Sequence, residues 1–132
     1  MGNTSPVVII IDDDQAVRDY ARFILELEGM IVFEATDGNQ GLAKASEHHP
    51  SLIITDLVMP DKEGIETIRE IKERFPGCGI VAISGALNSQ SYLSLASCLG
   101  AHCVVRKPFD RRQFLDAVRK ALALRDGASG AV

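Results

Sequence analysis

Five short apolar runs recur along the chain, and each is followed by a stretch whose apolar residues recur at helical spacing. Three of the runs are almost entirely apolar, which is typical of strands that are covered on both faces of a parallel sheet. The pattern predicts five strands, at Val7 to Ile11, Ile31 to Glu34, Leu52 to Thr55, Ile80 to Ile83 and Cys103 to Arg106.

The stretches between and after these runs predict five helices. Their apolar residues recur every three or four positions, and glycine or proline follows most of them. The fourth helix is expected from about Asn88 to Leu99, and Asp110 is expected to cap the fifth. The apolar positions of the first, second, third and fifth helices are, in that order, Val17, Ala21, Ile24 and Leu25; Gly41, Leu42 and Ala45; Ile65, Ile68, Ile71 and Phe75; and Phe114, Val118 and Leu122. Alternating strands and helices predict a doubly wound α/β domain, because parallel neighbours need crossover helices.

Length and composition narrow the class of protein. A chain of 132 residues suits a single domain, and its longest apolar run is far too short to span a membrane. Residues 1–6 lack the features of a secretory signal, so we expect a soluble, cytoplasmic protein. The odd number of cysteines, without CxxC spacing, excludes a disulfide framework and a zinc knuckle and indicates free thiols at Cys78, Cys98 and Cys103.

The charge is mildly acidic overall, with a formal net charge of -4 and a basic C-terminal end. With a sequence pI near 5.3, general nucleic-acid binding by this chain is not expected. The basic positions, among them Arg111, Arg112, Arg119 and Lys120, are either a solvated helix face or a docking site for an acidic partner.

Polar residues follow four of the five predicted strands. Since the carboxyl ends of parallel strands form the ligand-binding edge of an open sheet, these residues are expected to converge on one site. They are Asp12, Asp13 and Asp14; Thr55 and Asp56; Ser84 and Gly85; and Arg106, Lys107 and Pro108.

The acidic residues at this edge indicate a cation. Asp12, Asp13 and Asp56 would repel one another unless a hard divalent ion held them, and Mg²⁺ suits a site that combines carboxylates with phosphate oxygens. With the ion held, a carboxylate can attack a phosphoryl group, while Lys107 and the metal neutralise the charge that is transferred. Ser84 supplies a hydroxyl for a phosphate oxygen. These residue types favour phosphoryl transfer onto an aspartate.

The chain resembles the CheY-like receiver domains of two-component response regulators. The segments IIIDDDQAVR, ATDGNQGL, ITDLVMPDKEG, VAISGA and VVRKPF stand in the order and spacing of that family. The resemblance extends from about Val7 to Leu124. The resemblance implies a flavodoxin-like fold with strand order 2-1-3-4-5 and a signalling switch rather than an enzyme. It also implies a receiver domain over residues 7–124, flanked by flexible segments at 1–6 and 125–132.

The same resemblance implies residue roles. Asp56 would accept the phosphoryl group, and Asp12, Asp13, Asp56 and the backbone carbonyl of Val58 would hold Mg²⁺. Ser84 would be the switch hydroxyl. Lys107 would contact the phosphate and precede a cis peptide bond to Pro108. Asp14 is interpreted as a helix cap, and Met59, Pro60 and Gly64 as residues that shape the turn after the acceptor.

The resemblance to receiver domains also implies partners. A histidine kinase or phosphotransfer protein would be the donor, and the surface of the fourth helix, fifth strand and fifth helix would control a downstream protein or an output domain. A phosphorylation-dependent homodimer is a further expectation, and Leu93 on the fourth helix is either a partner contact or partly buried. Where the family commonly has Tyr or Phe, three residues before Lys107, this chain has Val104. Output therefore relies on backbone movement after Ser84, or the aromatic role is absent.

Two apolar residues predict a long-lived phosphoryl group. In the family, the positions two residues after Asp56 and two after Ser84 control access of the attacking water. Here they are Val58 and Ala86, whose side chains cannot orient water by hydrogen bonding. We expect hydrolysis that is slow for this family.

Two competing functions stay open from the residues. Asp12 and Asp14 form a D-x-D pair that is also found in small aspartate-nucleophile phosphohydrolases, although so short a chain leaves little room for a substrate cap. A receiver-like interaction domain that takes no phosphate is the other alternative. The sequence also leaves open whether the chain is a whole protein or a piece of a larger regulator.

Overall fold

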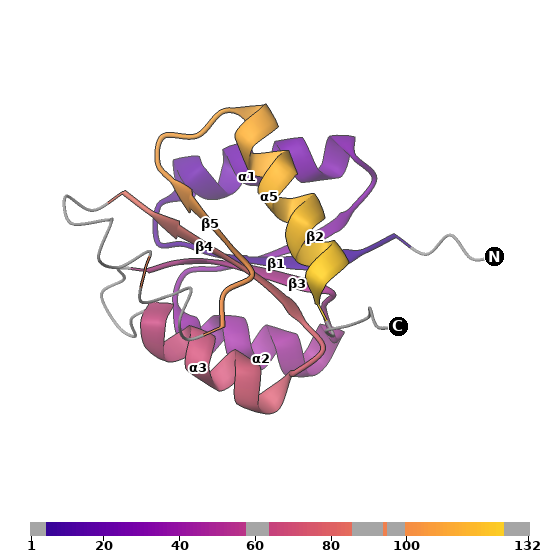
Figure 1. The fold of residues 1–132 in the computed structure, drawn as a ribbon, viewed down its shortest axis with the longest axis vertical. Helices are drawn as coiled ribbons and strands as arrows, with labels where there is room; N and C mark the ends of the chain where they lie inside the picture. Colours follow the sequence, from indigo (N-terminus) through magenta and orange to yellow (C-terminus); the bar gives the residue numbers. More distant parts are fainter. Residues whose placement is uncertain (1–4, 58–63, 86–93, 95–99, 126–132) are drawn as a thin grey trace.

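The computed structural model describes residues 5–57, 64–85, 94 and 100–125. Five parallel strands form one sheet in the order β2-β1-β3-β4-β5 (Figure 1). The predicted fold class is confirmed, including the strand order. The strands are β1 Val7–Ile11, β2 Ile31–Ala35, β3 Leu52–Asp56, β4 Gly79–Ser84 and β5 Cys103–Arg106.

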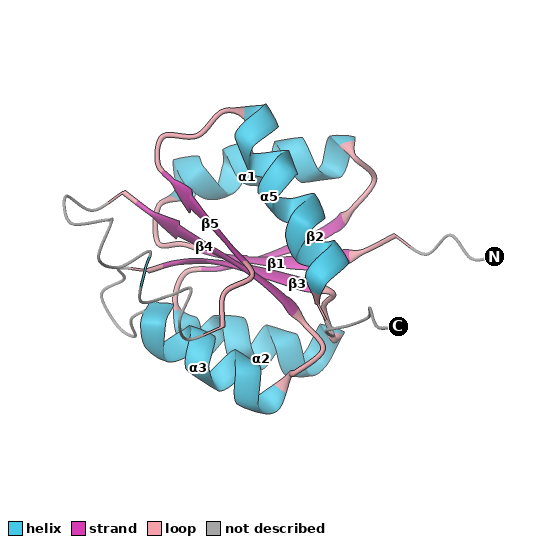
Figure 2. Cartoon of the chain, in the orientation of Figure 1, coloured by secondary structure: helices cyan, strands magenta, loops and turns pink. Residues whose placement is uncertain are grey.

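Helices cover both faces of the sheet (Figure 2). One face carries α1, Gln15–Leu27, and α5, Arg111–Leu124, and the other carries α2, Gly38–His48, and α3, Gly64–Arg74. Each helix pair closes a separate apolar core against the sheet. The central strands β1, β3 and β4 contribute to both cores, which explains why their sequences are almost continuously apolar. The fourth predicted helix, from about Asn88 to Leu99, lies outside the described residues except for Ser94.

Aspartate side chains set the starts of three helices. Asp14, Asp37 and Asp110 stand in extended backbone and accept hydrogen bonds from the first turn of α1, α2 and α5. The predicted caps at Asp14 and Asp110 are confirmed. Asp37 also explains why α2 begins at Gly38, ahead of its first apolar residues. Gly29, with φ of 84°, follows the end of α1 as expected.

Three strands extend beyond their predicted ends. Ala35 pairs with Ile11, and Asp56 pairs with Ile83. Ser84 is the last residue of β4 and pairs with Arg106. At Asp56 and Ser84, side-chain polarity ended the predictions too early, because the backbone of these two residues is still held in the sheet.

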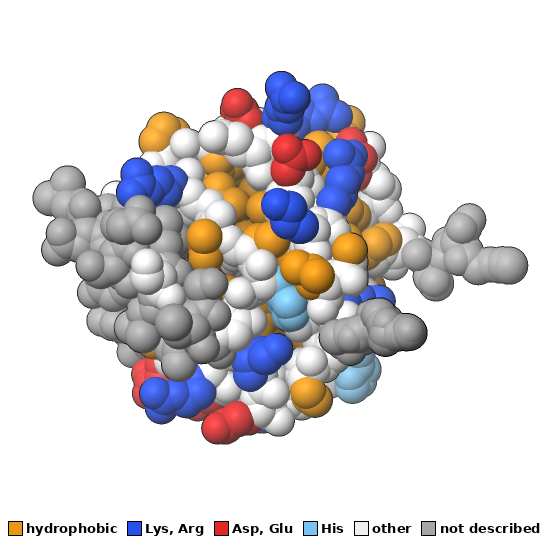
Figure 3. Space-filling model, in the orientation of Figure 1, with side chains coloured by type: hydrophobic (Ala, Val, Ile, Leu, Met, Phe, Trp, Pro, Cys, Tyr) orange, Lys and Arg blue, Asp and Glu red, His pale blue; other side chains and the backbone are white. Residues whose placement is uncertain are grey.

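The basic side chains of the C-terminal helix α5 face solvent. Arg111, Arg112, Arg119 and Lys120 are all exposed. Arg111 and Arg119 both contact the carboxylate of Glu28, at 3.3 and 3.0 Å. Basic and acidic side chains accordingly lie side by side over the upper part of the molecule, where α1 and α5 are found (Figure 3). Two of these four basic residues thus pair within the chain.

Among the described helices, none is long and apolar enough to cross a membrane. Cys78 and Cys103 are free thiols, as expected. Burial raises the pKa of the Cys78 thiol to about 12. Cys98 lies outside the described residues.

Candidate functional site

Buried polar side chains concentrate at one edge of the sheet. Of the five in the described part of the chain, Thr67 belongs to α3, and the other four lie at the carboxyl ends of strands. They are Asp12, Thr55, Asp56 and Ser84. Burial of polar groups is unfavourable unless they find partners, so a group of them at one edge indicates a built site.

Lys107 joins the strand ends that carry the acidic residues. Its backbone N–H donates to the carbonyl of Ser84 at 2.9 Å. Its Nζ lies 2.9 Å from Oδ2 of Asp12 and 3.3 Å from Oδ2 of Asp56. The peptide bond from Lys107 to Pro108 is cis. The end of β5 is thus tied to the ends of β1, β3 and β4.

The environment keeps Lys107 charged. Burial lowers the pKa of its ammonium, but the carboxylates of Asp12 and Asp56 outweigh burial, and the pKa is raised. One ammonium faces three carboxylates, because Asp13 stands beside this pair. The site therefore has room for further positive charge.

The carboxylates have the arrangement of a cation site. One oxygen from each of Asp12, Asp13 and Asp56 lies within 4.8 Å of the other two. Three carboxylate oxygens gathered this closely could serve as oxygen ligands of a divalent cation such as Mg²⁺. Oδ2 of Asp12 is buried, and the Lys107 ammonium at 2.9 Å is its ion-pair partner. A cluster of hard carboxylate oxygens of this kind fits Mg²⁺.

A close backbone approach shapes the turn after Asp56. The N–H of Gly64 donates to the carbonyl of Leu57 at 3.0 Å, and the N–H of Leu57 donates to Ile83 at 2.9 Å. A Cβ at Gly64 would overlap the carbonyl oxygen of Asp56 and lie 2.6 Å from Cα of Leu57. Glycine is thus required where α3 begins. Val58, Met59, Pro60 and Ala86, which the sequence also singled out, lie outside the described residues.

An apolar cavity of about 540 Å³ opens beside the acidic cluster. Tyr20 of α1 and Phe109 of the β5–α5 connection form one wall, with ring centroids 5.8 Å apart. Gly85, Lys107 and Pro108 are also part of the lining. Val104 lies three residues before Lys107, in the edge strand β5, and is 38% exposed. Sequence analysis did not find this cavity, because its aromatic residues are 89 positions apart in the chain and meet only through α1 and β5.

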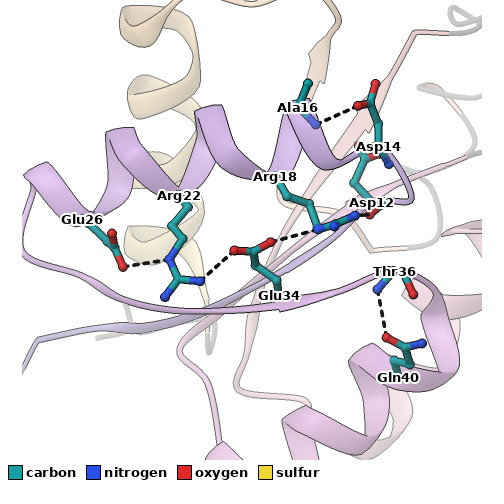
Figure 4. A network of polar contacts seen from close by, with 9 residues as sticks. All are labelled: Asp12, Asp14, Ala16, Arg18, Arg22, Glu26, Glu34, Thr36 and Gln40. Carbon is teal, nitrogen blue, oxygen red and sulfur yellow. Dashed lines mark hydrogen bonds and ion pairs between the residues drawn. The ribbon is translucent and has the colours of Figure 1, made fainter.

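Arg18 and Glu34 also escaped the sequence analysis. Arg18 of α1 donates from Nη1 to the backbone carbonyl of Asp12 at 2.8 Å, and its Nε donates to Glu34 at 2.9 Å (Figure 4). The available signal was Glu34 itself, since a carboxylate within a largely apolar strand requires a buried or half-buried partner.

Comparisons with known proteins identify relatives of this chain. Residues 8–119 match the family model described as the response regulator receiver domain. Over 115 residues, the chain is 37% identical to the KDP operon transcriptional regulatory protein KdpE of Escherichia coli and 33% identical to the chemotaxis protein CheY of Halobacterium salinarum. Each match covers 87% of this chain. The chain spans 95% of that CheY but only 50% of KdpE.

A solved structure has the same fold. The CheY-like response regulator receiver domain protein of Methanospirillum hungatei is similar with a TM-score of 0.81 and 29% sequence identity. The match covers 90% of this chain and 94% of that one.

Proposed function

The chain belongs to the response regulator receiver domain family of two-component signalling, and we propose that Asp56 is its phosphoacceptor. The observation that carries this proposal is the convergence of Asp12, Asp13 and Asp56 with the Lys107 ammonium at the carboxyl edge of the sheet. An isolated acidic turn would not place a buried carboxylate next to both a cation-binding cluster and a lysine.

The proposed reaction transfers a phosphoryl group from a phosphohistidine. A carboxylate oxygen of Asp56 attacks phosphorus, and the new O–P bond forms as the N–P bond to the donor imidazole breaks. The electron pair of the broken bond stays on the imidazole nitrogen, which then takes up a proton. A histidine kinase or a histidine phosphotransfer protein would supply the donor group.

The residues around Asp56 fit this transfer. Asp12 and Asp13, with Asp56 and the carbonyl of Val58, would hold Mg²⁺. When bound, that ion supplies positive charge next to the transferring oxygens. The Lys107 ammonium, which contacts Asp56, would contact the phosphoryl oxygens during the transfer. It would there stabilise the charge of the transition state.

The apolar cavity supports a docking role beside the acceptor. The donor histidine must approach within bonding distance of Asp56, and the wall formed by Tyr20 and Phe109 is the described apolar surface adjacent to Lys107. Tyr20 is 43% exposed, so it can bury further area against a partner. We propose that the donor protein packs on this wall while a small acyl phosphate does not need it.

Phosphorylation would act through Ser84 and the β5 edge. The Ser84 hydroxyl is fully buried at the end of β4, and the Lys107 N–H holds the backbone of Ser84. A phosphoryl group on Asp56 would draw this hydroxyl toward it and shift the surface of the fourth helix, β5 and α5. Val104 cannot act as an aromatic rotamer switch, so the backbone after Ser84 would carry the change.

The relatives indicate what kind of output partner this receiver has, but not which protein it is. KdpE is a transcriptional regulatory protein twice as long as the matched region, whereas the CheY relative is matched over almost its whole length. We propose that this receiver acts in the cytoplasm on a downstream protein or an output domain, and that phosphorylation favours a homodimer through the same surface.

The lifetime of the phosphorylated state would be long. Val58 and Ala86 offer no hydrogen bond to an attacking water, so hydrolysis of phosphorylated Asp56 should be slow for this family. Loss of the phosphoryl label within seconds, after donor removal, would contradict this.

Intact-mass measurement after incubation with acetyl phosphate and Mg²⁺ tests the function. The proposal predicts a single phosphoryl adduct that requires Mg²⁺ and is absent from Asp56→Asn. Continuous release of inorganic phosphate that survives in Asp56→Asn but is lost in Asp12→Asn would instead indicate an aspartate-nucleophile phosphohydrolase. Absence of any adduct in the wild-type chain would favour a receiver that takes no phosphate.

A further inference from the structure

A chain of charged side chains connects α1 to the backbone of the acidic loop (Figure 4). Glu34 of β2 accepts from two arginines of α1, with Arg18 Nε at 2.9 Å from Oε1 and Arg22 Nη1 at 2.7 Å from Oε2. Arg22 also donates to Glu26 at 2.9 Å. Arg18 uses its other donor, Nη1, for the carbonyl oxygen of Asp12 at 2.8 Å. Glu34 thereby orients the guanidinium that holds this carbonyl.

The two arginines differ in burial and in reach. The side chain of Arg18 is 13% exposed and that of Arg22 is 42% exposed. Hydrogen bonding from Arg22, with a further contribution from Arg18, lowers the pKa of Glu34 against the opposing effect of burial. Glu34 therefore stays ionised, and the Arg18 contacts are charge-assisted bonds in a partly buried setting.

The carbonyl that Arg18 holds belongs to the peptide that connects Asp12 to Asp13. The N–H of Asp12 donates to Ala35 of β2 at 3.1 Å, and its Oδ1 accepts from the N–H of Asp14 at 2.9 Å. Arg18 adds the third fixed point on the same residue. Fixing this peptide restricts the directions in which the two consecutive carboxylates leave the backbone.

We propose that Arg18 is a positioning residue for the cation site, and that Glu34 of β2 aims it. This inference rests on the proposed function, since it concerns the Mg²⁺ that Asp12 and Asp13 would hold. Arg18 touches neither the ion nor the phosphoryl group. It acts through the loop backbone, in the way that outer partners orient metal ligands.

The direction in which Mg²⁺ affinity changes when Arg18 is replaced distinguishes a positioning role from a purely electrostatic one. Arg18 carries positive charge near a site for a divalent cation, so its charge alone disfavours Mg²⁺. Removal of that charge would tighten Mg²⁺ binding if electrostatics were its whole influence. If Arg18 positions the loop, the same change weakens Mg²⁺ binding, because the carboxylates lose their fixed directions.

The experiment titrates the full chain with MgCl₂ and follows the backbone amide signals of Asp12 and Asp13 by NMR. Arg18→Met is compared with Arg22→Met, which removes an equal charge and a bond to the same Glu34 without removing the Asp12 contact. Arg18→Lys keeps the charge, but its single nitrogen cannot bridge the Asp12 carbonyl and Glu34 as the guanidinium does. Thermal unfolding in EDTA measures the structural effect of each change separately.

We expect the Mg²⁺ dissociation constant to rise roughly tenfold in Arg18→Met, the lower end of what loss of an outer partner costs. Arg22→Met should stay within about twofold of the wild-type value. Arg18→Lys should recover part of the loss, and it also replaces Arg18→Met as the test variant if the latter does not fold. Unfolding temperatures in EDTA should fall for both methionine variants, which separates the metal effect from stability.

Tighter or unchanged Mg²⁺ binding in Arg18→Met would overturn the inference while leaving the proposed function intact. An equal loss of affinity in Arg22→Met would also overturn it, because the effect would then be general to α1. If the wild-type chain shows no Mg²⁺-dependent shift at Asp12 and Asp13, the proposed function fails and this inference fails with it.

Discussion

Substitution of Gly64 by alanine perturbs the acceptor turn directly. The new methyl group would overlap the carbonyl oxygen of Asp56 and lie 2.6 Å from Cα of Leu57. Both obstacles are backbone atoms at the end of β3, where Leu57 is fully buried and bonded to Ile83. No side-chain rotation can relieve the overlap, so either the strand end or the start of α3 must move.

The magnitude follows from two opposing effects. Overpacking against a fixed backbone costs about 3 kcal/mol, the upper end of the usual range. The helix preference of alanine over glycine returns at most about 1 kcal/mol. The net loss at Gly64 is therefore about 2 kcal/mol, or about 8 °C in Tm for a chain of this length.

Gly41→Ala is the matched control. Its Cβ would also meet close neighbours, but these are side-chain atoms of Ile11, with Cγ1 at 2.6 Å. The buried Ile11 side chain must shift, but it can do so without moving the backbone, and Gly41 is inside α2, where alanine gains its full helix preference. We expect this variant to stay within about 1 kcal/mol of the wild-type stability.

Thermal denaturation and the rate of phosphorylation by acetyl phosphate measure the two consequences of the Gly64 change. A displaced Asp56 carboxylate should lower the phosphorylation rate by at least about tenfold, since misplacement by about 1 Å can cost about a hundredfold. Gly41→Ala should retain the wild-type rate. The reasoning is refuted if Gly64→Ala matches the wild-type chain in both Tm and phosphorylation rate.

Three further predictions concern the charge of Lys107, the docking wall formed by Tyr20 and Phe109, and the pH dependence of stability. Lys107→Met should slow phosphorylation by at least about tenfold while Mg²⁺ binds no more weakly, because the ammonium no longer competes for the carboxylates; calorimetry or NMR that showed lost Mg²⁺ binding would contradict this. Tyr20→Ala should slow transfer from a phosphotransfer protein and leave the acetyl phosphate rate unchanged, and equal slowing with both donors would contradict a docking role. Burial, with a smaller effect of Lys72, lowers the pKa of His102 in the folded chain, and its Nδ1 accepts from the Ile80 N–H at 3.0 Å. Between that lowered pKa and the unfolded value of about 6.5, the unfolded chain binds more protons, so the stability contribution is present above pH 6.5 and is lost as the pH falls through this window. Urea denaturation of the wild-type chain and His102→Gln across pH 5 to 7.5 should show a smaller pH dependence in the variant, and equal slopes would contradict this role.

The fold could be predicted from the sequence because the apolar patterns of the strands and the capping residues of the helices indicate the same arrangement. The buried strands β1, β3 and β4 are apolar on both faces, and such short apolar runs have the length of strands rather than of helices. Asp14 and Asp110 stand about one helical turn ahead of apolar residues at helical spacing, so both caps could be predicted. Asp56 and Ser84 were placed just past their strands because polarity suggested a loop, whereas the sheet holds their backbones.

The site was predictable in part for a different reason. Asp12, Asp13, Asp56 and Lys107 each follow an apolar run, and the geometry of a parallel sheet brings such residues together. The Arg18 and Glu34 contacts could not be derived that way, because they require β2 to lie beside β1 with α1 packed across both. The wall of Tyr20 and Phe109 depends in the same way on tertiary packing.

The central claim is that Asp56 takes up a phosphoryl group in a reaction that requires Mg²⁺. Borohydride reduction after treatment with acetyl phosphate converts an aspartyl phosphate to homoserine, and peptide mass spectrometry then locates it. The account predicts homoserine at position 56 in the wild-type chain, in samples with Mg²⁺ and not in samples with EDTA. Homoserine at position 12 or 13, or the same yield in EDTA, would contradict it.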